Sequence, residues 1–327
     1  MTDPTKATLA AQWPHGRPLV SCRFGPSGKY AFAGSEDYTV QRFNIADGTH
    51  VGLAGHDSWV KAIAFSKDGL QVITCGYDGR MIWWPVEGEA PQAVRTVEGH
   101  AGWIRSAVVH PDGSLLATAG NDLVVRLWNV ADGSLVKELP GHQKPIWTVE
   151  WHPSGQFLMS GDLAGVLNQW DVATGQVARV FDAKPLHTYE GGQQVDFGGV
   201  RALSFSPDGK YLAAGGLHKG TNPLGAVHEP LVLLFDWAAG TLVRSHITEG
   251  IPGGVVWAAR HLADGTLIAA SGGSTGGFLL FFKPDADKDF FRFQLPNILR
   301  DADLHTDGVR IATAHHDGHL RITSVAG

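Results

Sequence analysis

The chain has 327 residues, including 42 glycines and 11 tryptophans, and its formal net charge is −6. This composition is typical of a folded, turn-rich β protein, and the length allows either two ordinary domains or one large closed β domain. The negative charge argues against broad binding to a phosphate backbone, which requires a cationic surface, so we expect no nucleic-acid partner.

The first residues, MTDPTKATLAAQWPHG, lack the basic and apolar regions of a secretory signal. No run of about 18 uncharged apolar residues follows, so we expect no membrane association and a cytoplasmic location. The two cysteines, Cys22 and Cys75, each lie in an apolar β-like run. We expect them to be buried free thiols and not a disulfide or a metal pair.

One unit recurs along the whole chain: an alternating apolar run, a turn containing glycine, a second apolar run, a tight polar turn, and a third run that often ends in tryptophan. The first turns of seven copies lie 41 to 56 residues apart, which matches one four-stranded propeller blade. In chain order they are Ser27-Gly28, Asp68-Gly69, Asp112-Gly113, Ser154-Gly155, Asp208-Gly209, Asp264-Gly265 and Asp307-Gly308.

The predicted fold is therefore all-β: a single domain over residues 1–327 that forms a seven-bladed β-propeller of four-stranded antiparallel blades. The expected blade cores are approximately 15–54, 55–98, 99–140, 141–185, 186–245, 246–289, and 290–327 plus 6–13.

The second and third copies read GHDSWVKAIAFSKDGLQVITCGYDGRMIWW and GHAGWIRSAVVHPDGSLLATAGNDLVVRLWNV. They closely resemble the WD-repeat family, and the resemblance covers nearly the whole chain, most strongly residues 55–240. In that family a His, a Ser or Thr, an Asp and a Trp form hydrogen bonds across one blade and satisfy buried polar groups. The resemblance therefore implies a structural role for the matching residues here.

Two copies contain the complete set: His56, Thr74, Asp78 and Trp84 in the second, and His100, Thr118, Asp122 and Trp128 in the third. The fourth copy has His142, Ser160 and Trp170, but Ala164 stands where the aspartate is expected. Although these sets superficially resemble a hydrolase triad, we interpret them as structural and expect no catalytic residue among them.

The last copy ends with its third strand, Leu320 to Val325, so its fourth strand has to come from elsewhere in the chain. Residues Ala7 to Trp13 precede Pro14-His15 in the same way that Leu135 to Leu139 precede Gly141-His142. The N-terminal segment is therefore expected to pair as the outer strand of the last blade, which removes an open sheet edge.

The resemblance also implies that a fixed position of each inner strand lines the central mouth on one face. Across the copies this position holds Val20, Lys61, Arg105, Trp147, Arg201, Trp257 and Arg300. Four cations and two tryptophans are thus expected around one opening, without evident acids among them. Such a mouth favours an anionic or carboxylate-bearing partner.

Two positions earlier, the copies form an apolar and aromatic outer ring that could grip a peptide: Pro18, Trp59, Trp103, Pro145, Gly199, Val255 and Ile298. Alternatively, Trp59 and Trp103 only fill gaps between neighbouring blades. The fifth copy adds two insertions on the same face, FDAKPLHTYEGGQQVDFGG and LHKGTNPLGAVHEP, which are expected to rise beside Arg201. They could carry function or be tolerated insertions. An enlarged turn, SGGSTGGF at Ser271 to Phe278, predicts flexibility in the next blade.

Histidines gather in the fifth and last copies, at His187, His218, His228, His315, His316 and His319. Their spacing matches no metal-ligand signature, and adjacent residues of an extended turn point to opposite sides. No phosphate-binding glycine loop of the P-loop type occurs either. We therefore expect no metal and no other cofactor.

The preferred hypothesis is a non-catalytic scaffold, a monomer outside its complex, that binds a protein or peptide of acidic character. The residues expected to bind this partner are Lys61, Arg105, Trp147, Arg201, Trp257, Arg300, Trp59 and Trp103. An alternative is a propeller enzyme, a metal-assisted hydrolase or lyase with its site in the central channel, but the mouth positions provide no paired carboxylates and no evident general base. A third hypothesis is a structural subunit that uses only its rim or outer strands.

Overall fold

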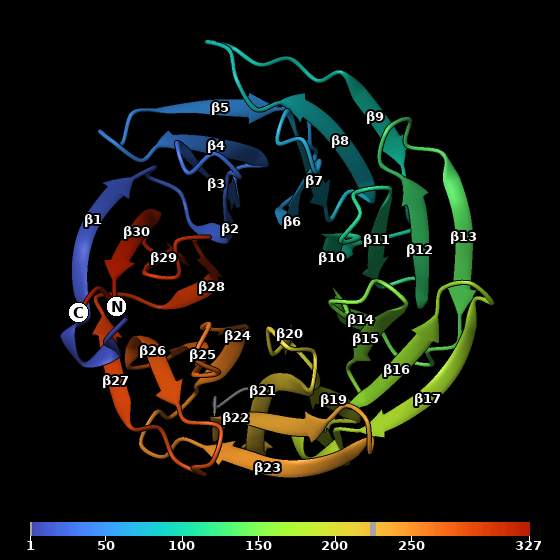
Figure 1. The fold of residues 1–327 in the computed structure, drawn as a ribbon, viewed down its shortest axis with the longest axis vertical. Coiled ribbons are helices and arrows are strands. Elements are labelled where there is room, and N and C mark those ends of the chain that lie inside the picture. Colours follow the sequence, from blue (N-terminus) through green and yellow to red (C-terminus); the bar gives the residue numbers. More distant parts are fainter. Residues whose placement is uncertain (1, 223–226) are drawn as a thin grey trace. The chain divides into compact units, whose positions relative to one another are not determined.

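The computed structural model describes residues 2–222 and 227–327. Their strands form seven four-stranded antiparallel sheets, so the chain is an all-β, seven-bladed propeller, as predicted (Figure 1). In the described residues the only helices are two short 3-10 helices, η1 (Pro4–Lys6) and η2 (Lys184–Leu186). None of the described helices has the length and apolar character that crossing a lipid bilayer requires. By their contacts the residues divide into two compact units, Met1–Glu138 with Arg300–Gly327, and Leu139–Leu299.

The first unit carries blades one, two and three and most of blade seven. Blade one consists of β2 (Leu19–Phe24), β3 (Tyr30–Ser35), β4 (Thr39–Asn44) and β5 (His50–Ala54). Blade two consists of β6 (Val60–Phe65), β7 (Gln71–Gly76), β8 (Arg80–Pro85) and β9 (Arg95–Glu98). Blade three consists of β10 (Ile104–Val109), β11 (Leu115–Gly120), β12 (Val124–Asn129) and β13 (Leu135–Pro140). Blade seven consists of β28 (Leu299–Leu304), β29 (Arg310–His315), β30 (His319–Ser324) and the N-terminal β1 (Thr8–Pro14).

The N-terminal strand closes blade seven, which confirms the prediction. β1 pairs antiparallel with β30, so that Thr8 lies opposite Ser324 and Trp13 lies opposite Leu320. The Trp13 ring also stacks on Phe43 of blade one, with the ring centroids 6.4 Å apart. β1 therefore both covers the edge of β30 and packs against a second blade.

The second unit carries blades four, five and six and a separate hairpin. Blade four consists of β14 (Ile146–Trp151), β15 (Phe157–Asp162), β16 (Val166–Asp171) and β17 (Gln176–Asp182). Blade five consists of β20 (Ala202–Phe205), β21 (Tyr211–Asn222), β22 (Val227–Asp236) and β23 (Thr241–Ile247). Blade six consists of β24 (Val255–His261), β25 (Leu267–Gly273), β26 (Gly276–Phe282) and β27 (Phe291–Leu295). The separate hairpin consists of β18 (His187–Glu190) and β19 (Val195–Gly198).

Within each unit the apolar core lies between neighbouring blades. In the first unit, Trp83 of blade two packs with Leu116 and Trp128 of blade three. In the second unit, Phe181 of blade four packs with Phe235 of blade five. The second strands β3, β7 and β11 are therefore buried at every position but the first, while outer strands such as β5 and β13 are exposed or half-buried at all positions but one. Cys22 and Cys75 are buried free thiols in this core, as predicted.

Two segments predicted as enlarged turns continue the strands instead. The prediction of an enlarged turn at Ser271 to Phe278 is wrong, because β25 and β26 pair as far as Gly273 opposite Gly276. In blade five the second insertion extends β21 and β22, with His218 opposite Glu229, and its residues 223–226 lie outside the described part of the chain. Pairing between the inserted residues satisfies their backbone groups, which a loop would leave to solvent.

Candidate functional site

A β-bulge marks the predicted mouth position near the start of the inner strand. In five blades the register between the first two strands shifts across this one residue, which is Val20, Lys61, Arg105, Trp147 or Trp257. A bulge leaves one residue outside the regular pairing and changes the direction of its side chain. In blade five, Arg201 immediately precedes β20, and its N–H donates to the carbonyl of Gly215 at 2.8 Å.

In the first unit Arg105 contacts a stack of aromatic rings. We call this group the first cluster; it consists of Trp59, Tyr77, Trp103 and Arg105. The Tyr77 and Trp103 rings are parallel within 4°, with centroids 4.4 Å apart, and the Trp59 ring lies 6.1 Å from Tyr77. The Arg105 guanidinium carbon lies 4.9 Å from the Trp103 ring centre and 5.4 Å from that of Tyr77. Its Nε donates to Asn121 Oδ1 at 2.7 Å. Trp59 and Trp103 are 37% and 43% exposed, so part of each ring is accessible to solvent.

The other two cations predicted at the mouth in this unit, Lys61 and Arg300, contact polar groups of neighbouring residues of the chain. Lys61 Nζ donates to the carbonyls of Val20, at 2.7 Å, and Arg300, at 3.3 Å, and burial lowers the pKa of Lys61. The Arg300 guanidinium forms an ion pair with Glu36 at 2.5 Å and contacts Nδ1 of His316 at 2.9 Å. The expectation that no acid accompanies the mouth cations is therefore wrong for Arg300, because the tight turn of blade one brings Glu36 to it.

The residue just before the aspartate of a tight turn supplies several of these contacts. Glu36 and His316 contact Arg300, while Tyr77 and Asn121 contact Arg105. In each case one contact comes from the arginine's own blade and the other from a neighbouring blade. Our sequence reasoning missed these four residues. Comparison of this turn position across the copies would have found them.

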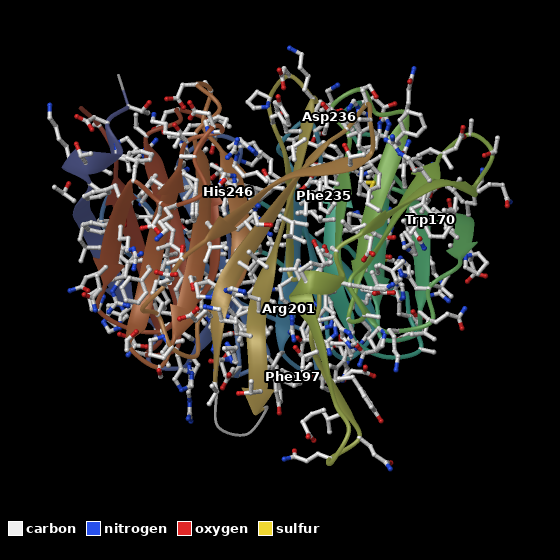
Figure 2. All side chains as sticks on the ribbon, turned by 90° about the horizontal axis from the view of Figure 1, so that it is seen from below. Trp170, Phe197, Arg201, Phe235, Asp236 and His246 are labelled. Carbon is white, nitrogen blue, oxygen red and sulfur yellow. The ribbon has the colours of Figure 1, made fainter. Side chains whose placement is uncertain are left out.

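In the second unit Arg201 contacts two tryptophans. We call this group the second cluster; it consists of Trp147, Arg201 and Trp257. The Arg201 guanidinium carbon lies 3.3 Å from the Trp147 ring centre and 5.5 Å from that of Trp257. Its Nε donates to the carbonyl of Gly198 at 2.7 Å, at the end of the hairpin strand β19. The first insertion of blade five thus reaches Arg201, as expected, and in Figure 2 Phe197 of this hairpin is labelled below Arg201.

The β18–β19 hairpin is fixed by contacts on two sides. Asp196 accepts from Lys144 Nζ at 2.5 Å and is 2.8 Å from Nε2 of His187. The hairpin also packs on β21 through the Phe197 ring. A Cβ at Gly220 of β21 would lie 2.2 Å from this ring. Only glycine leaves room for that ring. The hairpin therefore holds Gly198 in place beneath the second cluster's arginine.

The predicted hydrogen-bonded sets of blades two and three are present. His56 Nδ1 lies 2.9 Å from Asp78, and its Nε2 lies 2.9 Å from the hydroxyl of Thr74, which also accepts from Trp84 Nε1 at 2.9 Å. The ionised aspartate only accepts, so Nδ1 donates and the threonine hydroxyl donates to Nε2. Blade three repeats these contacts with distances of 2.7 to 2.9 Å among His100, Thr118, Asp122 and Trp128.

Blade four also has a complete set, which corrects the expectation that Ala164 leaves it without an aspartate. Asp162, the last residue of β15, lies 2.8 Å from His142 Nδ1, and Ser160 bridges His142 and Trp170 at 2.7 Å each. The carboxylate also accepts from the backbone N–H groups of Ala164 and Val166. The aspartate is thus supplied from two residues earlier in the repeat.

The family described as WD domain, G-beta repeat matches four segments of the chain: residues 49–85, 91–129, 133–171 and 183–220. These segments contain the three hydrogen-bonded sets. The chain belongs to the WD-repeat family. This WD-repeat chain is 25% identical to protein hir1 of Schizosaccharomyces pombe over 219 residues, which cover 61% of the chain and 18% of hir1.

Two further relatives of the WD-repeat chain match shorter segments. Protein HIR1 of Chaetomium globosum is 25% identical over 126 residues, or 28% of the chain and 12% of that protein. Nuclear distribution protein nudF 2 of Aspergillus clavatus is 29% identical over 79 residues, or 24% of the chain and 18% of that protein. The matched part of the WD-repeat chain thus spans 18%, 12% and 18% of these three relatives.

The histidines considered as metal ligands each have separate contacts in the WD-repeat chain. His315 is buried with Nε2 2.8 Å from Thr313, and His319 Nδ1 lies 3.3 Å from Asp317. In blade five, His228 Nδ1 lies 3.1 Å from the Gly254 carbonyl, and His218 lies 3.8 Å from Glu229. Among the residues that the structure describes, no group of three or more His, Cys, Asp or Glu side chains could hold a metal ion.

Proposed function

We propose that this WD-repeat chain is a non-catalytic scaffold that binds a protein or peptide partner, and that carboxylates of the partner contact Arg105 and Arg201. The observation that carries the proposal is the placement of both guanidinium groups on aromatic rings, at 4.9 Å from Trp103 and 3.3 Å from Trp147. Aromatic contact holds a guanidinium in one orientation, so less entropy is lost when it binds a carboxylate.

The chemistry of the two clusters supports this choice of partner. A guanidinium can bind a carboxylate through two parallel hydrogen bonds, and arginine and tryptophan are enriched among the residues that dominate binding energy at interfaces. Trp59 and Trp103 are partly exposed and provide apolar area next to Arg105. Lys61 and Arg300 contribute less, because the protein's own carbonyls and Glu36 occupy them.

The histidine sets support a structural role and not a catalytic one. The side chains of His56, His100 and His142 are 0% exposed, and the hydroxyl that contacts each histidine also accepts a hydrogen bond from a tryptophan. A nucleophilic hydroxyl has to reach its substrate, whereas these hydroxyls are inside the blades.

Charge reversal tests the proposal. Arg105→Glu, Arg201→Glu and the double variant are compared with wild type in affinity capture from source-cell lysate, with quantitative mass spectrometry of the retained proteins. Lys67→Glu, an exposed lysine in the first turn of blade two, is the matched control for the charge change. We expect the double variant to lose a specific partner by about tenfold or more, because reversed charges repel its carboxylates, while the control retains it.

A second measurement makes the capture experiment decisive. The captured partner's most acidic segment is synthesised as a peptide, together with its Glu→Gln and Asp→Asn counterpart, and both are titrated against the wild-type chain. Only the acidic peptide is expected to compete with the partner. Equal capture by the double variant, with unchanged melting temperature, contradicts the proposal and moves the binding surface to the rim.

The monomeric state and the cytoplasmic location remain proposals that accompany this function. Sedimentation of the purified chain at several concentrations tests the first, since a monomer keeps one mass throughout. Fractionation of source cells with an antibody to the chain tests the second.

A further inference from the structure

A cavity of about 240 Å³ lies between blades five and six in the second unit. Its walls include Tyr211, Leu234 and Leu267, and its polar residues include two aspartates of the first turns, Asp208 and Asp264, and two histidines, His246 and His261. This volume is below the range of about 300–1,000 Å³ of sites for drug-sized ligands, so it suits a group of side-chain size. In Figure 2, His246 lies on the side of Asp236, away from Arg201 and Phe197.

His246 provides a buried hydrogen-bond acceptor without a partner. The residue is 1% exposed, and its Nδ1 lies 2.9 Å from the carbonyl oxygen of Ala286. Because a carbonyl only accepts, Nδ1 carries the proton, and Nε2 of the neutral ring has a lone pair. Nε2 is buried and has no hydrogen-bond partner in the structure. An unsatisfied buried acceptor is destabilising, and an N–H group of a ligand would satisfy it.

The charges around the cavity favour a cationic donor. Hydrogen bonds with backbone and side-chain groups keep the pKa of Asp208 and of Asp264 below the usual value, so both carboxylates are ionised at neutral pH. Their lysine partners, Lys210 at 3.2 Å and Lys283 at 3.9 Å, have side chains that are 73% and 47% exposed, so solvent weakens both ion pairs and a ligand can replace them.

His261 is also particular to this blade. The equivalent position of the inner strand holds an apolar residue in the other six copies: Phe24, Phe65, Val109, Trp151, Phe205 and Leu304. His261 Nδ1 lies 3.0 Å from the Ser204 hydroxyl. The corresponding cavity between blades two and three has Lys67, Asp68 and Gln71 in its lining but no histidine. The paired histidines therefore distinguish the cavity of blades five and six.

We propose that this cavity binds an alkylammonium group, from a lysine side chain of a partner or from a free amine. The ammonium N–H groups donate to His246 Nε2 and interact with the Asp208 and Asp264 carboxylates, while the alkyl stem packs on Leu234 and Leu267. The inference is independent of the two arginine clusters.

The test is an NMR titration of the full chain with ¹³C-labelled histidine. n-Butylamine is compared with n-butanol and butyrate, its neutral and anionic counterparts, and with lysine blocked at both ends. We expect saturable shifts of the His246 ring resonances with butylamine, at an affinity at least about tenfold above that for butanol or butyrate. A similar response to blocked lysine identifies a partner's side chain as the source, and a response to butylamine alone identifies a free amine.

Variants provide the second arm. Asp264→Asn and His246→Phe are expected to weaken butylamine binding by about tenfold or more, whereas Asp68→Asn in the cavity of blades two and three leaves it unchanged. Equal binding of butylamine, butanol and butyrate by the wild-type chain overturns the proposal, since only apolar contact would then operate. A His246 response to Zn²⁺ and not to butylamine overturns it as well. Both outcomes are read on the wild-type protein, so they do not depend on the folding of any variant.

Discussion

His142 of blade four obtains its carboxylate from a repeat position that glycine occupies in blade two. A Cβ at that glycine, Gly76, would lie 2.5 Å from Asp78 Oδ1 and 2.6 Å from His56 Nδ1. A side chain at this position therefore reaches the same point as the turn aspartate two residues later. This explains how Asp162 replaces an aspartate at position 164 without changing the rest of the hydrogen-bonded set.

Because an aspartate at position 162 or 164 can reach His142, moving it from one position to the other should preserve stability. Asp162→Gly should lower the free energy of unfolding by about 1–3 kcal/mol, because the buried Nδ1–H of His142 loses its acceptor. Adding Ala164→Asp should restore most of the loss, since this recreates the arrangement of blade two. Urea denaturation measures both, with Asp182→Gly as control because that side chain is 68% exposed. A double variant as unstable as the single one contradicts the interpretation.

The two cavity histidines make stability depend on pH. Burial lowers the pKa of His246 and of His261 to about 4, whereas an exposed histidine titrates near 6.5. Between these values the unfolded chain binds protons that the folded chain does not, so the free energy of unfolding decreases as the pH falls from 6.5 to 4. The loss amounts to about 3 kcal/mol for each histidine.

Urea denaturation at pH 7.5, 6 and 4.5 checks this dependence. His261→Phe introduces the residue that blade five carries at the same position, Phe205, and should reduce the loss of stability on acidification. His187→Phe is the control, since that histidine belongs to the β18–β19 hairpin and does not line the cavity. The same pH dependence in wild type and His261→Phe would show that His261 does not titrate as inferred.

At the level of elements, the strand that completes blade seven comes from the other end of the chain. Without β1, the backbone groups of β30 from His319 to Ser324 would form an open sheet edge. Trp13 would also no longer cover Phe43. Open edges favour intermolecular pairing, so β1 contributes to solubility as well as to stability.

Deletion of residues 2–13 should therefore lower the Tm by about 10 °C or more and promote aggregation. Deletion of residues 2–6 is the control, because it removes η1 but leaves β1 intact. Differential scanning calorimetry and light scattering measure the two effects. Equal Tm values for wild type and the longer deletion would contradict the closing role of β1.

The bulges are the other feature that acts at this level. Each one places a single residue outside the regular pairing near the start of an inner strand, and five blades share it. The repeat thus fixes the backbone at this position while the side chain varies from valine to lysine, arginine and tryptophan. The residue at this position can therefore vary from blade to blade without a change of fold.

At the level of the whole molecule, the positions expected to bind a partner divide between two compact units. The first unit contains Arg105 with its aromatic stack, and the second contains Arg201 with Trp147 and Trp257. Testing each arginine separately as well as together therefore shows whether one cluster suffices. The cavity with His246 also belongs to the second unit, but no residue of either cluster lines it, so its amine binding can be measured independently of both clusters.

The sequence by itself determined the blades, the closing strand and two of the hydrogen-bonded sets. The blades follow from local patterns, since alternating apolar residues and glycine turns specify strands and hairpins wherever they recur. The hydrogen-bonded sets follow from the resemblance of these copies to the WD-repeat family. A bulge recurs at the position expected to line the mouth, near the start of the inner strand, and the role of that position in binding stays a prediction.

Only the tertiary structure decided which side chains meet. Glu36 and Arg300 are 264 residues apart in the chain and form an ion pair because blades seven and one are neighbours. The place of Tyr77 between Trp59 and Trp103 in the stack, and the unpaired Nε2 of His246, likewise depend on contacts across or between blades. A repeat pattern specifies each blade separately, whereas pairing, charge compensation and burial at the site are set by which blades lie together.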